Sequence, residues 1–304
     1  MQLGMIGLGK MGGNMARRLR KVDIDIVGFN RDVSVTEELA AECGLIATES
    51  VGALVNRLDA PRVVWLMLPA GEITESYFAQ MRELLEPGDI LVDGANSYYK
   101  DSMRRGELLR SDGIHFLDAG VSGGVWGLEN GYALMVGGSD EAFAAIKPVI
   151  AALAPAADSG WIHTGPVGSG HFVKMIHNGI EYGMMQAYAE GFALMQGRDD
   201  FGLNLAEIAE AWRHGSVVRS WLLDLTADVL ANDQALDSVQ PFVADSGEGR
   251  WTALEGIEQG LPTPVMSLAL MARFSTQGKQ DYSAKLLAMM RNQFGGHAIK
   301  SIDD

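Results

Sequence analysis

Residues 2–12 of the chain read QLGMIGLGKMG, an apolar segment followed at once by the glycine pattern G-x-G-x-x-G. The apolar segment predicts a strand, and residues 14–21, NMARRLRK, favour a helix directly afterwards. Between a first strand and a first helix, Gly7 permits the tight turn, Gly9 lets the backbone approach a pyrophosphate, and Gly12 lets the helix pack on the strand. The pattern therefore predicts a dinucleotide-binding loop whose helix N-terminus faces the phosphates, with a glycine-rich turn that binds no ligand as the alternative. The residues expected to contact the dinucleotide here are Gly7, Leu8, Gly9, Lys10, Met11 and Gly12.

A second expected strand, residues 25–29, ends at Asn30, Arg31 and Asp32, about where an acidic residue usually meets the adenosine ribose. Asn30 stands in the place of that carboxylate, and Asp32 follows two residues later. A carboxylate here would repel a 2′-phosphate, whereas Arg31 could stack on adenine or attract the same phosphate. We expect all three residues to contact the cofactor, with NAD favoured and NADP still possible.

Strands and helices alternate through the first half of the chain. Helices are expected at 33–43, from 50, from 71 to 85 and at 140–153, and strands at 45–46, 62–68, 90–93, 115–121 and 133–136. This alternation is typical of a doubly wound, Rossmann-type α/β sheet. Ligands bind beyond the carboxyl ends of such strands, and the residues expected to contact the cofactor there are Met67, Leu68, Pro69 and Asn96. Asn96 as a plain turn residue is the alternative, and residues 155–166 are the expected boundary of a dinucleotide-binding domain that spans residues 1–165.

A serine and two glycines, Ser122, Gly123 and Gly124, follow the strand expected at 115–121. Successive glycines after a serine expose several backbone N–H groups, which commonly hold a carboxylate or an oxyanion. This turn is therefore a candidate anion-binding site.

Residues 168–193, GSGHFVKMIHNGIEYGMMQAYAEGFA, predict one long helix that begins just after Pro166. Lys174, His177, Asn178 and Glu181 fall at i, i+3, i+4 and i+7, so they lie on one face over two turns, roughly 10 Å from first to last. The rest of the helix is largely apolar, which favours an interior helix with a polar seam that lines a cavity. A sheltered amine and carboxylate suit proton transfer near neutral pH. A buried polar network that only joins two helices is the alternative.

The second half of the chain shows almost no strand signal. Helices are expected at 203–215, 216–231, 250–259, 263–274 and 280–293, so residues 166–304 predict an all-α domain. Its basic residues are either helix-surface cations or clamps for a phosphate or carboxylate. The candidates for such clamps are Arg250, Arg273, Arg291 and His297.

Composition excludes several classes of function. The 304 residues carry 24 basic and 39 acidic side chains, a net charge of −15, which argues against binding to nucleic acid or to an anionic membrane. The single cysteine, Cys43, excludes an internal disulfide and fits a reducing compartment such as the cytoplasm. We expect no signal peptide and no membrane span, because no apolar run reaches about 18 residues. The six histidines show no metal-ligand spacing, so no metal is expected.

Five stretches together carry a resemblance to a known family: GLGKMG at 7–12, VSGG at 121–124, GSGHFVKMIHNGIEYG at 168–183, DSGEGRWTA at 245–253 and RNQFGGH at 291–297. The chain resembles the decarboxylating 6-phosphogluconate dehydrogenases, in the shorter of the family's two lengths. VSGG and K-x-x-x-N are shared with the wider β-hydroxyacid dehydrogenases, whereas His177, Glu181 and Tyr182 are more particular to the 6-phosphogluconate enzymes.

The resemblance implies the oxidative decarboxylation of 6-phospho-D-gluconate to D-ribulose 5-phosphate and CO₂, a reaction of the pentose phosphate pathway. Lys174 matches the base that takes the proton of the C3 hydroxyl, and Glu181 the acid that protonates the enediol, with Asn178 beside them. It further implies a homodimer or homotetramer in which a neighbouring subunit supplies part of the phosphate site. The implied substrate contacts are Asn96, Ser122, Gly123, Gly124, His177, Asn178 and Tyr182, with Arg273, Arg291 and His297 on the phosphate side.

The chain also departs from the family pattern. The loop at 247–250 is shorter than in the long form and lacks its lysine, so Arg250 is an open candidate to replace it. Asp32 stands where NADP-using members have a small hydroxyl residue, which favours NAD. Two other functions remain as alternatives: a 3-hydroxyisobutyrate-type dehydrogenase that does not decarboxylate, and a non-catalytic NAD-binding sensor.

Overall fold

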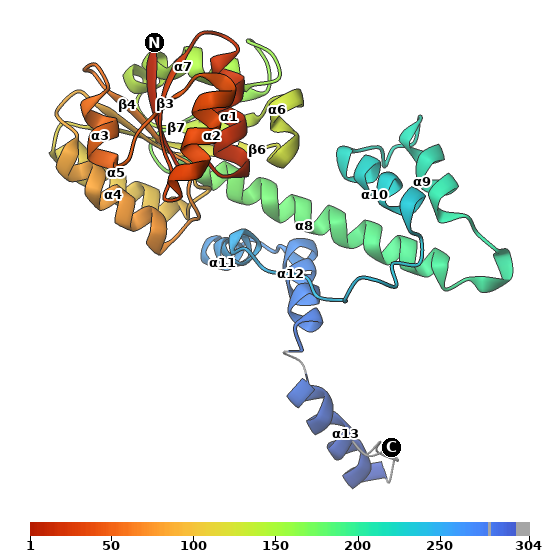
Figure 1. Cartoon of the computed structure of the whole chain (residues 1–304). Coiled ribbons are helices and arrows are strands. Elements are labelled where there is room, and N and C mark those ends of the chain that lie inside the picture. The colour runs from red at the N-terminus through yellow and green to blue at the C-terminus, as the bar shows by residue number, and fades with distance from the viewer. Residues whose placement is uncertain (279–280, 296–304) are drawn as a thin grey trace. The chain divides into compact units, whose positions relative to one another are not determined.

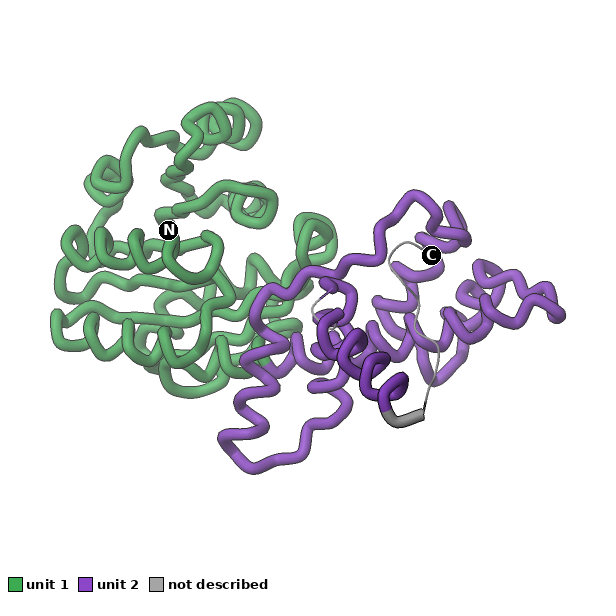
Figure 2. Tube along the Cα trace, turned by 90° about the horizontal axis from the view of Figure 1, so that it is seen from below, with its two compact units in different colours: residues 1–175 green, residues 176–304 purple. Residues whose placement is uncertain are grey.

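The computed structural model describes residues 1–278 and 281–295. The chain divides into two compact units, residues 1–175 and 176–304, which Figure 2 distinguishes by colour. The division falls inside one continuous helix, α8 (Ser169–Gln196), so this helix contributes residues to both units.

The first unit is built on a sheet of eight strands in the described part of the chain, in the order β3-β2-β1-β4-β5-β6-β7-β8. All neighbouring strands run parallel except β6 and β7, which pair antiparallel. The strands are β1 (Gln2–Ile6), β2 (Asp25–Phe29), β3 (Ile46–Ala47), β4 (Val63–Leu66), β5 (Ile90–Asp93), β6 (His115–Ser122), β7 (Ala133–Gly137) and β8 (Trp161–Gly165). The predicted doubly wound sheet is thereby confirmed.

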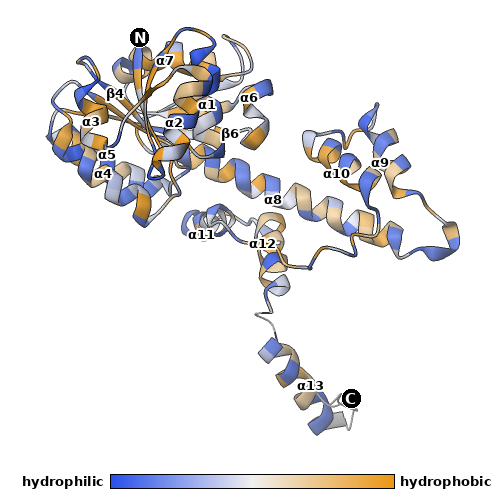
Figure 3. Ribbon diagram, viewed as in Figure 1, coloured by the Kyte–Doolittle hydropathy of each residue, from blue (hydrophilic) through white to orange (hydrophobic). Residues whose placement is uncertain are grey.

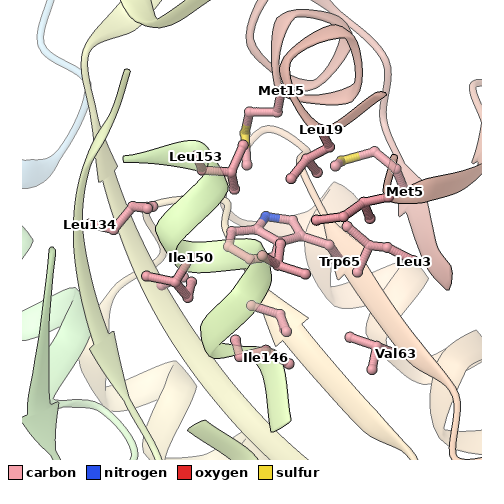
Figure 4. Close-up of a cluster of buried hydrophobic side chains, with 14 of the residues drawn as sticks. Leu3, Met5, Met15, Leu19, Val63, Trp65, Leu134, Ile146, Ile150 and Leu153 are labelled. Atoms are coloured by element: carbon pink, nitrogen blue, oxygen red, sulfur yellow. The ribbon is translucent and has the colours of Figure 1, made fainter. Parts of the chain in front are cut away.

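Helices cover both faces of this sheet (Figure 1). One core contains buried residues of α1, α2 and α7, and Figure 4 shows Trp65 of β4 at its centre with Met15 and Leu19 of α1 nearby. The opposite core contains buried residues of α3, α4 and α5. The helices and short 3₁₀ turn of this unit are α1 (Lys10–Arg20), α2 (Val33–Cys43), α3 (Val51–Asn56), α4 (Glu72–Leu84), α5 (Tyr99–Ser111), η1 (Gly124–Trp126), α6 (Gly127–Asn130) and α7 (Asp140–Leu153).

Two elements of the first unit differ from the sequence prediction. Strand β8 was not predicted, and it lies within residues 155–166, the expected domain boundary. The strand has only five residues and lies at the sheet edge, where none of its residues is fully buried, so it lacks a continuous apolar run. Helix α5 was not predicted. Three consecutive polar or charged residues near its start, Lys100, Asp101 and Ser102, interrupt its apolar pattern.

The second unit is helical, as predicted, with boundaries set by local caps. Helix α10 begins at Trp221 and not at 216, because the Ser220 side chain accepts a hydrogen bond from the Leu223 N–H and caps it. Helix α12 has Pro264 in its first turn, where a missing N–H has no cost. The elements that follow α8 are η2 (Asp199–Phe201), α9 (Leu205–Arg213), α10 (Trp221–Asn232), α11 (Glu248–Gln259), α12 (Pro264–Thr276) and α13 (Asp281–Gly295).

Helix α8 is not an interior helix along its whole length, contrary to the sequence prediction. Its apolar residues Val173, Ile180 and Met184 are 37%, 52% and 39% exposed in the single chain. In Figure 3 the ribbon is coloured as hydrophobic at positions along α8 and also along α12. Among the described residues, no helix combines the length and the apolar character needed to cross a membrane.

Candidate active site

The glycine loop between β1 and α1 has the backbone that the sequence pattern requires. Gly7 has φ +94°, and a Cβ there would lie 2.3 Å from the Met67 carbonyl oxygen. A Cβ on Gly12 would lie 2.0 Å from the Gly7 carbonyl oxygen. A Cβ on Gly9, in contrast, would meet no described atom within 4 Å, so the loop presents open space at the N-terminus of α1. A pyrophosphate fits this arrangement of a bare backbone and a helix N-terminus.

The neighbouring cofactor candidates are tied together by hydrogen bonds. Asn30 Oδ1 accepts from the Leu8 N–H at 3.1 Å, and Asn30 Nδ2 donates to the Asp32 carbonyl at 3.1 Å. The Leu8 side chain is buried in the core, whereas Lys10 and Arg31 are exposed. Asp32 Oδ1 accepts from both the N–H and the hydroxyl of Ser34, so the carboxylate caps α2. Asn30 thus fixes the loop, and Asp32 has a structural role in addition to the ribose contact predicted for it.

Asn96 joins the carboxyl ends of β5 and β6. Its φ is +51°, its Oδ1 accepts from the Val121 N–H at 2.9 Å, and its Nδ2 donates to the Val121 carbonyl at 3.1 Å. A substrate hydroxyl at Asn96 would therefore bind a side-chain amide that is also hydrogen-bonded to the Val121 backbone. Asn96 thus links two strands, which a plain turn residue does not do.

A buried ion cluster fixes the same loop from behind. Arg105 of α5 is 1% exposed and donates to Asp93 Oδ2 at 2.8 Å, to Ser97 Oγ at 3.1 Å and to Glu75 Oε2 at 2.8 Å. Ser97 Oγ also donates to Asp93 Oδ2 at 2.8 Å. Because each buried charge has a partner, the cluster can hold the loop in one conformation without an unpaired charge. Sequence reasoning missed these residues.

The turn at 122–124 has two left-handed glycines. Gly123 has φ +139° and Gly124 has φ +54°, and a Cβ on Gly124 would meet no described atom within 4 Å. The half-buried Ser122 ends β6. The predicted exposure of backbone N–H groups at this turn is consistent with the open space above Gly124.

Lys174 is held against β6 by two residues that sequence reasoning did not single out. The Lys174 side chain is 5% exposed. A Cβ on Gly120 would lie 2.4 Å from Lys174 Cβ, so only glycine leaves room for the lysine. The buried Asp118 accepts from the Gly168 N–H at 2.6 Å and from the His171 N–H at 2.7 Å, which fixes the N-terminus of α8 on the strand.

Asp118, Gly120 and Ser122 alternate along β6, so they lie on the same face of the strand. Burial raises the pKa of Asp118, while the His171 charge and the two N–H donors oppose this rise. Polar and small residues at alternate positions of a buried strand are a signal that could have identified this face. Its partner on α8 could not be identified, because Asp118 and Gly168 are 50 residues apart.

The polar seam of α8 continues in the second unit. His177 Nδ1 lies 3.0 Å from Asn178 Oδ1 and 3.8 Å from Glu181 Oε2. The side chains of His177 and Glu181 are each 37% exposed. Because α8 is one regular helix, Lys174 and Glu181 lie on the same side of it, two turns apart. An amine and a carboxylate at this separation can serve two different atoms of one ligand.

Tyr182, predicted as a substrate contact, lies against Arg273, predicted on the phosphate side. Tyr182 is 4% exposed, and the Arg273 guanidinium carbon lies 3.4 Å from the centroid of its ring. Arg250 instead pairs with Asp245 at 2.5 Å and lies 5.4 Å from the Phe274 ring centroid. Arg291 is exposed on α13, and His297 lies outside the described residues. The described residues contain no cluster of three or more potential metal ligands.

Comparison with known proteins assigns both halves of the chain to one family. Residues 2–165 match the model of the NAD binding domain of 6-phosphogluconate dehydrogenase, and residues 170–285 match that of the 6-phosphogluconate dehydrogenase C-terminal domain. The chain is 39% identical over 306 residues to the NAD(+)-dependent, decarboxylating 6-phosphogluconate dehydrogenase of Haloferax volcanii, covering 100% of both chains. It is 35% identical to the NADP(+)-dependent enzyme of Bacillus subtilis, covering 92% of this chain and 62% of that one.

A solved structure shows the same likeness. The 6-phosphogluconate dehydrogenase of Plasmodium falciparum, described in its apo form and in complexes with NADP+ and with its substrate 6-phosphogluconate, matches with a TM-score of 0.84 and 31% identity. The match covers 100% of this chain and 67% of that chain.

Proposed function

The chain belongs to the 6-phosphogluconate dehydrogenase family, and from this premise we propose that it catalyses the oxidative decarboxylation of 6-phospho-D-gluconate to D-ribulose 5-phosphate and CO₂. The observation that carries the proposal is the placement of Lys174 and Glu181, a buried amine and a half-exposed carboxylate two turns apart on one face of α8. NAD is the preferred cofactor, because the full-length Haloferax relative is NAD-dependent and we assign the contact with the adenosine ribose to Asp32.

The two groups divide the proton transfers of the reaction. Lys174, as a neutral amine, takes the proton of the C3 hydroxyl. NAD, which the glycine loop at residues 7–12 would hold, would supply the acceptor for the hydride from C3. The Lys174 ammonium then donates a hydrogen bond to the new C3 carbonyl and favours the departure of C1 as CO₂, whose bonding electron pair remains on C2. Glu181 donates a proton to C2 of the resulting enediolate, so the C3 carbonyl re-forms and C2 becomes C1 of the ketopentose phosphate, while Lys174 stays protonated and Glu181 is left ionised.

The other site residues orient the sugar chain. We assign the turn at Ser122, Gly123 and Gly124 to the substrate carboxylate end, because its backbone N–H groups suit an anion. Asn96, His177 and Asn178 supply polar contacts to the hydroxyls. Tyr182 and Arg273 contact the phosphate end, where a guanidinium favours a phosphate.

We also propose that the protein acts in the cytoplasm as a homodimer or homotetramer. Exposed apolar side chains on α11 and α12 support the association of subunits: Ile257, Val265 and Leu268 are 77%, 68% and 67% exposed in the single chain. In this assembly Arg291 and His297 would complete the phosphate site of a neighbouring subunit.

The test supplies 6-phosphogluconate labelled with ¹⁴C at C1 together with NAD or NADP, and follows nucleotide reduction and CO₂ release. We expect equal amounts of both products, and their loss by a factor of about 10³ or more in Lys174→Met, because the base is absent. The exposed Lys21→Met is the matched control and should retain full activity. Reduction of NAD by 3-hydroxyisobutyrate without gas release would favour the alternative dehydrogenase. Binding of NAD without turnover of any sugar acid would favour the sensor.

A further inference from the structure

A hydrogen-bonded chain leads from the predicted phosphate side to a carboxylate. The Tyr182 hydroxyl lies 3.1 Å from Ser246 Oγ, which donates to Glu248 Oε2 at 2.5 Å. Glu248 is the first residue of α11 and is half-buried. All three residues belong to the second unit, so their arrangement is that of a single compact body.

The loop that carries Glu248 packs closely on Tyr182. A Cβ on Gly249 would lie 2.3 Å from the Tyr182 ring, so the backbone that carries Glu248 lies directly against the tyrosine. Gly247 has φ +106°, which turns the chain so that α11 begins there. The Arg273 guanidinium covers the ring 3.4 Å from its centroid. Tyr182, Arg273 and Glu248 are therefore held in one fixed group.

Arg250 does not contribute its charge to this group. It pairs with Asp245, which also accepts from the Gly247 N–H at 3.0 Å. Although burial opposes it, the hydrogen bonds from Arg250 and the Gly247 N–H lower the pKa of Asp245, so the pair is ionised on both sides. Arg250 and Asp245 offset each other's charge, and Asp245 also attracts Arg273. Within the group of Tyr182, Arg273 and Glu248, the charged side chains are the Arg273 guanidinium and the Glu248 carboxylate.

A phosphate dianion beside Tyr182 would be attracted by Arg273 and repelled by Glu248. A free hydroxyl at the same end of a sugar acid would not be repelled, and it could donate a hydrogen bond to the carboxylate. We propose that Glu248 is a specificity-determining residue, which weakens the preference of this enzyme for a phosphorylated over an unphosphorylated sugar acid. This inference rests on the proposed function, because it assigns Tyr182 and Arg273 to the phosphate end of the substrate.

The test measures binding without turnover, by calorimetric titration of the full-length protein with 6-phosphogluconate and with gluconate in the absence of NAD. We expect Glu248→Gln to lower Kd for 6-phosphogluconate by about fivefold, the effect of one partly solvated like charge, and to leave Kd for gluconate unchanged or raised. High salt should reduce the gain, because it screens the removed repulsion. Glu207→Gln is the matched control, because Glu207 is an exposed acid in the first turn of α9. Its replacement removes one negative charge and one favourable interaction with a helix dipole, as Glu248→Gln does.

A second variant protects the test against a folding defect. Ser246→Ala keeps the carboxylate but removes its link to Tyr182, so we expect a smaller change in the same direction than in Glu248→Gln. For each variant, the Kd for 6-phosphogluconate is divided by the Kd for gluconate. The inference would be overturned if this ratio were the same in Glu248→Gln and Glu207→Gln, or if Glu248→Gln bound 6-phosphogluconate more weakly than the unaltered protein. Failure of the proposed function has a different signature, namely tight binding of 6-phosphogluconate by the unaltered protein with no reduced nucleotide and no CO₂ when NAD is added.

Discussion

At the scale of single residues, the position of Lys174 depends on the absence of a side chain opposite it. Gly120 has no unusual φ, so its importance comes from space and not from backbone freedom. The carboxylate of Asp118, two residues earlier on the same strand face, fixes the helix end from which Lys174 projects. The amine that we propose as the base is thus positioned by a glycine and an acid to which we assign no part in the chemistry.

Gly120→Ala should therefore reduce kcat by about 10²-fold, because its Cβ would displace Lys174 by roughly 1 Å. KM for 6-phosphogluconate should change much less, since the other contacts remain. The control is Gly191→Ala on α8, the helix that carries Lys174. An added Cβ there meets no described atom within 4 Å and should stabilise α8 by about 0.5–1 kcal/mol. Unchanged kcat in Gly120→Ala, measured by steady-state kinetics on a folded sample, would show that the strand does not set the lysine position.

Asp32→Thr should raise kcat/KM for NADP by about tenfold and lower it for NAD, because it removes a carboxylate that repels the 2′-phosphate. Threonine is also an accepted N-cap, so α2 should lose no more than about 0.5–1 kcal/mol of stability. Initial rates with both nucleotides, beside thermal unfolding of both proteins, separate the two effects. No gain with NADP would mean that Asp32 acts only as the cap of α2.

At the scale of elements, the Glu75 carboxylate connects α4 to the buried Arg105 of α5. The hydrogen bond from Arg104, and then that from Arg105, lowers the pKa of Glu75 against the opposing effect of burial. A carboxyl with a lowered pKa binds its proton less readily in the folded chain. Its contribution to stability is therefore complete above its ordinary pKa of 4.5 and is lost as the pH falls through the lower folded value.

Glu75→Gln should accordingly flatten the dependence of stability on pH below about 4.5. The measurement is the urea midpoint of unfolding at a series of pH values from about 6 down to 3. Glu107→Gln is the comparison, because the Glu107–Arg110 pair is exposed and its effect should disappear in high salt, unlike that of Glu75. Parallel curves for Glu75→Gln and the unaltered protein would contradict the assignment.

The elements that sequence reasoning found are those with a strong local pattern. The glycine loop, the buried parallel strands and α8 all show their periodicity within about 10 to 25 residues. Strand β8 was not predicted, because it depends on pairing with β7, and the start of α10 was misplaced, because it depends on the cap at Ser220. In the site, the spacing of Lys174 and Glu181 could be predicted from helical geometry alone. The contacts of Asp118, Arg105 and Glu248 could not, since each joins segments that are distant in sequence or depends on a rotamer.

At the scale of the whole molecule, the second unit exposes many large apolar side chains in the single chain. Helices α11 and α12 expose Ile257, Val265 and Leu268, and α13 exposes Tyr282 and Leu287 as well. Exposed apolar residues in such number favour association with another copy of the chain. This feature agrees with the proposed sharing of Arg291 between subunits.

Subunit sharing can be tested by mixing two inactive variants, Lys174→Met and Arg291→Ala. If Arg291 acts in a neighbouring subunit, mixed assemblies regain sites that contain one intact copy of each residue. For a dimer, random exchange of subunits should restore roughly a quarter of the original activity. Activity after mixing no greater than the sum of the separate variants would place Arg291 in its own subunit's site, or outside the site.

The passage of α8 through the division between the two units affects how the chain can be cut. Residues 169–175 and 176–196 share one uninterrupted ladder of backbone hydrogen bonds. A protease that needs several extended residues finds none at this junction, so limited digestion should leave the two halves covalently attached and cleave first in irregular segments such as 233–247. A truncated protein that ends at residue 175 would keep less than two turns of α8, and Lys174 would lie at the frayed end of this short helix.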